Sequence, residues 1–226
     1  MLFACVAIFV LNASAQFSNI GSSNATVSDN SGWNTIYVEW NPSNANIPKN
    51  NVFFWDDDVD GKFNSYSLGY SRAVSLTPSL PIFLEFGLAG QFLHKSWKNY
   101  DNDQYKLSAI SVKIPINALY KFNIPNCPVS LIPFAGITVR GNVWGQLKIK
   151  DGYNMDRESK NYNVFDKKDM EGKDYTGKRV QVGWQVGLKA RFAQKIIIGG
   201  SYGSDFNEIF KDLKVHAGTL MIGYTF

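Results

Sequence analysis

Cysteine and histidine are scarce in this sequence of 226 residues, which contains two of each. Cys5 lies in an N-terminal segment that we expect to be removed, so Cys127 would be left alone, and we expect neither an internal disulfide nor a cysteine-based metal site. After that segment, no stretch reaches the roughly 18 consecutive apolar residues of a transmembrane helix. Charged residues are also few, at 19%, and the basic ones are interleaved with acidic ones, which does not favour a nucleic-acid-binding protein.

The first residues have the character of an export signal. Residues 1–15 are uncharged and mostly apolar, and they end in Ala13-Ser14-Ala15, a run of small residues typical of a cleavage site. We therefore expect a signal peptide over residues 1–15. Residues 16–32 are rich in Ser, Asn and Gly and are expected to form a flexible lead-in, so that the folded domain comprises residues 33–226.

Within that domain, apolar and polar residues alternate with a period of two. The clearest case is residues 180–192, where Val180, Val182, Trp184 and each further even position are apolar, whereas the odd positions are Gln, Gly, Lys or Arg. This period predicts a β-strand and not a helix. The same pattern occurs in seven other segments: 33–41, 64–76, 82–95, 106–122, 130–147, 195–203 and 215–226.

The connections between these eight segments alternate in length. The long ones are residues 42–62, 96–105, 148–179 and 204–214, and half of the residues in 148–179 are charged; the short ones are residues 77–81, 126–128 and 193–194. In an up-and-down barrel this order gathers the long loops at one end and both chain termini at the other. Outer-membrane barrels have this asymmetry, with short periplasmic turns and long extracellular loops.

The size of the apolar side chains indicates which face points outward. An eight-stranded barrel has an interior just wide enough to be filled by side chains or to hold one small ligand, and the apolar rows contain roughly forty side chains, many of them large. The opposite rows are mainly small or polar. The sequence therefore predicts an all-β fold, an eight-stranded antiparallel up-and-down transmembrane β-barrel. A soluble lipocalin-like carrier barrel, with the apolar rows inside, is the alternative.

Three short segments resemble a known family: residues 37–42 (Tyr-Val-Glu-Trp-Asn-Pro), 69–73 (Gly-Tyr-Ser-Arg-Ala) and 223–226 (Gly-Tyr-Thr-Phe). They look like the small outer-membrane β-barrels common in Bacteroidetes, which are broadly similar to OmpA-like and PorT-like barrels. The resemblance covers most of residues 33–226, implies a location in the outer membrane, and brings no catalytic residues. Tyr224 and Phe226 look like the terminal signal that the barrel-assembly machinery recognises.

The predicted inward rows carry seven charged side chains: Glu39, Glu85, Lys113, Lys121, Arg140, Lys189 and Arg191. Charges inside a narrow barrel need partners, so we expect a packed polar lumen of cross-strand salt bridges. A small porin-like pore, in which the excess of basic groups favours anions, is the alternative.

Other candidate sites are weaker. Asp56, Asp58 and Asp60, followed by Gly61, resemble the start of a calcium loop, but residue 67 is Ser where a bidentate Glu is needed, so we expect an acidic loop with at most weak divalent-cation binding, bridging to lipopolysaccharide. His94 and His216 belong to no catalytic motif, and we expect interfacial side chains, no enzymatic activity and no cofactor.

Aromatic residues near the ends of the predicted strands are expected to form the interfacial girdles of a membrane barrel: Trp33, Trp40, Trp97, Tyr66, Tyr105, Tyr120 and Phe122. Trp144 falls on the predicted inward row and is expected to pack in the lumen. The sequence thus indicates a non-enzymatic barrel with a structural, surface-interaction or secretion-accessory role. Its expected partners are outer-membrane lipids and lipopolysaccharide, the assembly machinery, and a surface or envelope protein.

Overall fold

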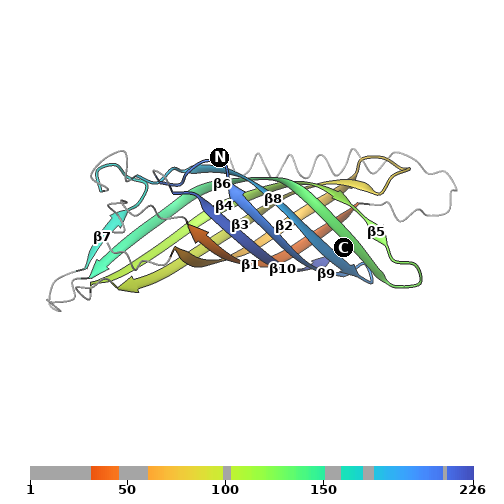
Figure 1. The fold of residues 1–226 in the computed structure, drawn as a ribbon, viewed down its shortest axis with the longest axis horizontal. Helices are drawn as coiled ribbons and strands as arrows, with labels where there is room; N and C mark the ends of the chain where they lie inside the picture. The colour runs from red at the N-terminus through yellow and green to blue at the C-terminus, as the bar shows by residue number, and fades with distance from the viewer. Residues whose placement is uncertain (1–31, 46–60, 99–102, 151–158, 170–175, 211–212) are drawn as a thin grey trace. The chain divides into compact units, whose positions relative to one another are not determined.

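Eight long strands form a closed antiparallel barrel in the computed structural model (Figure 1), which describes residues 32–45, 61–98, 103–150, 159–169, 176–210 and 213–226. The barrel strands are β1 (Trp33–Ala45), β2 (Lys62–Ser75), β3 (Ile82–Lys98), β4 (Gln104–Tyr120), β6 (Val129–Lys150), β8 (Val180–Phe192), β9 (Ile196–Asp205) and β10 (Val215–Thr225). Each strand pairs with its neighbours in chain order, and the pairing of β1 with β10 closes the barrel. Two short strands, β5 (Phe122–Asn123) and β7 (Lys160–Asn163), pair with β6.

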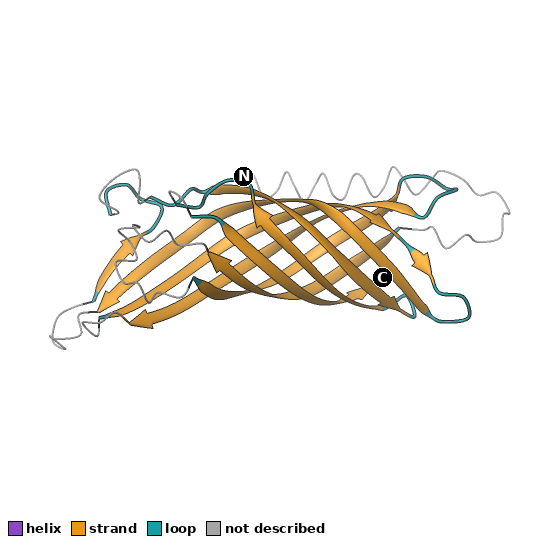
Figure 2. Ribbon diagram, viewed as in Figure 1, coloured by secondary structure: helices purple, strands orange, loops and turns teal. Residues whose placement is uncertain are grey.

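Strands and loops account for the described residues (Figure 2), and none of these residues belongs to a helix long and apolar enough to cross a membrane. The predicted strands are confirmed, and the bounds of β8 agree with the prediction. β6 continues to Lys150, and β7 falls inside the predicted loop 148–179. The short turn between β8 and β9 has positive φ at Ala193 (46°) and Gln194 (59°), as a tight hairpin turn requires.

The bulky apolar rows point outward, as predicted. Val38, Leu68, Leu188 and Ile222 have about half or more of their surface exposed, whereas the alternate residues Ser67, Lys189 and Thr225 are buried. A water-soluble carrier barrel has the opposite arrangement, with its apolar row inside. The outer surface of this barrel is thus suited to lipid.

A β-bulge in β6 reverses one part of the predicted pattern. Ser111 of β4 pairs with Asn142, but the preceding Ile110 pairs with Trp144, so Val143 is an extra residue in β6. An extra residue shifts every later side chain to the other face. Trp144 is therefore exposed on the outside, and Leu147 is buried inside. The prediction that Trp144 packs in the lumen is wrong for this reason.

Four of the residues predicted for the aromatic girdle lie on the outer face, and the prediction is wrong for the other three. Trp40, Tyr66, Tyr120 and Phe122 are exposed on the outer face. Trp33 instead points into the barrel, because it shares the inward row of Thr35 and Tyr37. Trp97 and Tyr105 also lie on inward rows, where their rings stack at 5.4 Å and pack against the buried Leu147, Val164 and Phe165.

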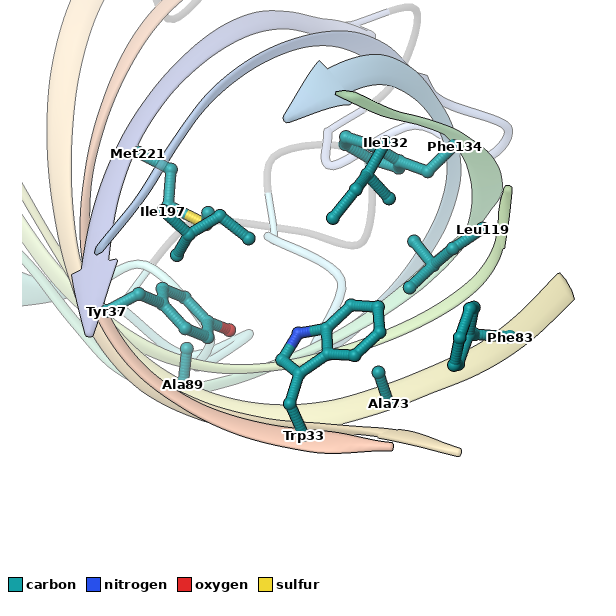
Figure 3. Packing of buried hydrophobic residues seen from close by; sticks show 10 residues of the cluster. All are labelled: Trp33, Tyr37, Ala73, Phe83, Ala89, Leu119, Ile132, Phe134, Ile197 and Met221. Carbon is teal, nitrogen blue, oxygen red and sulfur yellow. The ribbon is translucent and has the colours of Figure 1, made fainter. Parts of the chain in front are cut away.

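Trp33 belongs to an apolar layer whose side chains point into the barrel (Figure 3). Most of its members lie near the strand ends that meet the short turns, which we call the short-turn end. The layer contains Trp33, Tyr37, Ala73, Phe83, Ala89, Leu119, Ile132, Phe134, Ile197 and Met221. Phe83 and Ile132 have no exposed surface at all. The lumen is therefore not polar throughout, as the sequence had suggested, but has an apolar layer at one end.

Candidate functional site in the barrel lumen

The centre of the lumen is organised around an ion pair between Glu85 of β3 and Lys189 of β8. Lys189 Nζ lies 2.8 Å from Glu85 Oε1 and 2.6 Å from Oε2. Ser71 donates a hydrogen bond to Oε1 at 3.0 Å, and Asn117 donates one to Oε2 at 2.8 Å. Lys189 Nζ also lies 4.7 Å from the ring centroid of Phe134. The carboxylate and the ammonium are thus both fully engaged, which a buried pair requires.

Hydrogen bonds extend this ion pair across the barrel. Gln185 of β8 donates to Asn117 Oδ1 at 2.7 Å, so β8 contacts β4 through side chains although β6 lies between the two in the sheet. Glu39 of β1 and Lys113 of β4 form a second ion pair across the lumen. These contacts link strands that are not neighbours, so the side chains in the lumen connect separate parts of the barrel wall.

A third network lies nearer the end with the long connections, the long-loop end. Arg140 donates to Asp205 Oδ1 at 3.1 Å and to Gln181 Oε1 at 3.3 Å. Asn142 donates to the same Gln181 oxygen and accepts a 2.7 Å hydrogen bond from Ser111. Asp205 was not predicted as a lumen residue because its strand was expected to end at residue 203; continuing the period of two by one step places Asp205 in the lumen.

The other two predicted lumen charges lie at the short-turn end. The Arg191 guanidinium is 4.8 Å from the ring centroid of Trp33, and its Nε donates to Thr225 Oγ1 at 3.1 Å. Lys121 is buried, and its backbone N–H donates to the Pro81 carbonyl. The structure therefore places all seven predicted charges inside the barrel, but in separate groups along it.

Two small cavities lie in the described part of the lumen. One cavity of about 110 Å³ lies toward the long-loop end, and one of about 30 Å³ is lined by residues around the Glu85–Lys189 pair. Polar side chains such as Asn41, Gln91 and Arg140 line the larger cavity together with the apolar side chains of Val164 and Phe165.

Val164 and Phe165 reach this position because the segment after β7 folds over the inner face of β6. The Val164 N–H donates to the Gly145 carbonyl at 3.2 Å. A Cβ on Gly145 would lie 2.5 Å from Val164 Cγ2, so this close approach needs glycine. Phe210, from the connection between β9 and β10, packs against the same apolar cluster. The long-loop end thus also contains an apolar layer.

Among the described residues, the remaining predicted site residues do not come together in a second functional site. Asp56, Asp58 and Asp60 lie outside the described residues, and within the described ranges no three His, Cys, Asp or Glu residues are placed to hold a metal ion. His94 is on β3 and His216 on β10, with β2 and β1 between those strands. Tyr224 and Phe226 lie side by side on the outer surface at the short-turn end.

A closed barrel with an apolar exterior, aromatic residues toward both ends and a filled, charged lumen is the architecture of a transmembrane β-barrel. The chain belongs to the family described as the outer membrane protein beta-barrel domain, whose model matches residues 1–226. This membership places the protein in the outer membrane. No protein of curated function matches it.

Several solved structures of outer-membrane barrels are similar to this chain. Ail, the attachment invasion locus protein of Yersinia pestis, in complex with the heparin analogue sucrose octasulfate, is 16% identical, with 87% of this chain and 99% of that chain covered and a TM-score of 0.46. The outer membrane enzyme PagL is 10% identical over 83% and 97%, with a TM-score of 0.46. The N-terminal barrel of Pseudomonas aeruginosa OprF is 15% identical over 86% and 99%, with a TM-score of 0.35.

Proposed function

We propose that the protein is a non-conducting, non-enzymatic barrel that supports the envelope and presents its long-loop end at the cell surface for interaction with a surface or envelope partner. The observation that carries this proposal is the filled lumen. The Glu85–Lys189 pair and its hydrogen bonds occupy the centre, apolar layers lie toward both ends, and the two cavities found among the described lumen residues are small. Such a lumen supports a structural role better than a solute pathway.

The same proposal assigns an orientation and a route of assembly. The short-turn end, with Trp33 and Phe226, faces the periplasm, and the long connections face outside. Residues 1–15 act as the export signal, and Tyr224 and Phe226 present the terminal signal to the assembly machinery. Outer-membrane lipids and lipopolysaccharide surround the apolar exterior, and the acidic loop with Asp56, Asp58 and Asp60 offers weak divalent-cation contacts to lipopolysaccharide.

The first test is conductance. We expect the purified, refolded protein to give no stable conductance step in planar lipid bilayers, because the charged and apolar layers leave no continuous wide path for hydrated ions. Folding is checked on the same sample by comparing the migration of unboiled and boiled protein on a gel, and a porin serves as the positive control. A reproducible open level from folded protein would replace the structural role with the porin-like pore.

An enzymatic role has one geometric observation in its favour. His94 Nδ1 lies 3.0 Å from Ser108 Oγ, and its Nε2 lies 3.3 Å from Ser96 Oγ, on the outer face of β3 and β4. Hydrolysis by such a pair also needs donors for a developing oxyanion. The backbone of these residues belongs to the β3–β4 ladder, whose N–H groups are used in strand pairing.

We therefore expect His94→Ala to leave the acylation pattern of outer-membrane lipids unchanged. The measurement is mass spectrometry of lipids from cells producing the wild-type protein, the variant or neither. A pattern that depends on the wild-type protein and is lost in the variant would establish a hydrolase.

A further inference from the structure

The outer faces of β3, β4 and β6 change from apolar to basic at the same register near the long-loop end. The side chains that face outward form four successive rows across these strands: Phe92–Ile110–Trp144, His94–Ser108–Gln146, Ser96–Lys106–Lys148 and Lys98–Gln104–Lys150. The first row is the last apolar one, and each of its members has more than 40% of its surface exposed. Successive outward residues on a strand are roughly 7 Å apart. The first lysines therefore lie two outward positions along the strand beyond the last apolar row.

These rows hold four exposed lysines and no carboxylate. Lys106 lies directly opposite Lys148 in the β4–β6 pairing, an arrangement of like charges that destabilises a sheet when nothing compensates it. Over the described parts of the chain, none of Lys98, Lys106, Lys148 and Lys150 forms a salt bridge, whereas Lys113 and Lys189 in the lumen are both paired. We call these four residues the basic ladder.

We propose that the basic ladder binds the phosphate groups of an outer-leaflet glycolipid whose acyl chains lie against Phe92, Ile110 and Trp144. A phosphate between Lys106 and Lys148 replaces their repulsion with two charge-assisted contacts. Ser96, Ser108 and Gln146 add hydrogen-bond donors in the same rows, and Asn161 and Asn163 of β7 pair with Lys148 and Gln146 at the edge. The proposal rests on the orientation given above, in which the long-loop end faces outside.

The apolar row makes a lipid the occupant. A soluble polyanion needs only the lysines, but here the lysines follow, after one polar row, three large exposed apolar side chains on the same three strands. A lipid with a phosphorylated headgroup has its charge and its acyl chains in this order. Lysines near a membrane surface attract anionic headgroups, and the attraction falls off within the Debye length.

The experiment measures lipid retained by the folded protein in a mild detergent, using native mass spectrometry. The probes are lipid A with two phosphates and the same lipid A after enzymatic dephosphorylation. The variant is Lys106→Gln/Lys148→Gln, and the matched control is Lys167→Gln/Lys168→Gln, which removes two exposed lysines from the turn after β7. We expect about a tenfold weaker affinity of the ladder variant for phosphorylated lipid A, and wild-type affinity in the control.

Each outcome decides the proposal. Weaker binding in the ladder variant alone, together with poor retention of dephosphorylated lipid A by the wild type, supports it. Equal losses in both variants, an unchanged ladder variant, or full displacement of the lipid by millimolar inorganic phosphate would overturn it. Because binding is measured in detergent, a lack of lipid binding would overturn this proposal and leave the proposed function untouched. The proposed function is overturned instead if the protein conducts or does not fractionate with the outer membrane.

Discussion

We expect Glu85→Ala to lower the free energy of unfolding by about 3–5 kcal/mol, because it leaves the Lys189 ammonium buried without its counter-charge. Both carboxylate oxygens contact Lys189, and Ser71 and Asn117 lose their acceptor in the same step. The measurement is urea unfolding of the barrel from lipid vesicles, followed by tryptophan fluorescence and by the mobility of unboiled protein on a gel.

Two further variants show whether the loss comes from the unpaired charge. Glu85→Leu/Lys189→Met removes both charges, and we expect it to be within about 1 kcal/mol of the wild type or more stable, since buried ion pairs are often replaceable by apolar side chains. Ser71→Ala removes one hydrogen bond to Glu85 and should cost about 1 kcal/mol. A Glu85→Ala cost as small as that of Ser71→Ala would mean that water enters the lumen and solvates Lys189.

The second large effect concerns the outer face. We expect Leu188→Arg to cost about 2–4 kcal/mol of folding free energy in a bilayer, because Leu188 lies on the outward row halfway between Trp184 and Phe192 and a charge there contacts the middle of the hydrocarbon layer. Leu188 is 50% exposed. The measurement is the same vesicle unfolding experiment.

Val180→Arg provides the matched control, since Val180 is the first residue of the same strand and is similarly exposed, at 57%. Near the interface the penalty falls to about 0–1 kcal/mol. On a water-soluble barrel the two substitutions would both be within about 0.5 kcal/mol of neutral. Equal and small effects at positions 188 and 180 would therefore contradict a membrane-embedded outer face.

The strands and their faces follow directly from the order of residues. A period of two leaves one face apolar whichever strand pairs with it, so β8 was predicted with its bounds, and the outward direction followed from the size of the apolar side chains. Trp33 and Asp205 were misplaced or missed although the same period contains them. Both lie at the ends of strands. Trp33 was expected in the outward aromatic girdle, and the strand that contains Asp205 was expected to end at residue 203.

The three-dimensional structure was needed for everything that depends on the closure of the barrel. Glu85 and Lys189 are 104 positions apart on strands that are not neighbours, and only the register and curvature of the sheet bring them together. The bulge at Val143 reverses the faces of Trp144 and Leu147 by one extra residue, which no periodicity reveals in advance. The basic ladder also depends on strand pairing, because Lys106 and Lys148 become opposite each other only in the register in which β4 pairs with β6. Local alternation therefore determines which side chains face lipid and which face the lumen, whereas pairing between distant strands decides which charges meet.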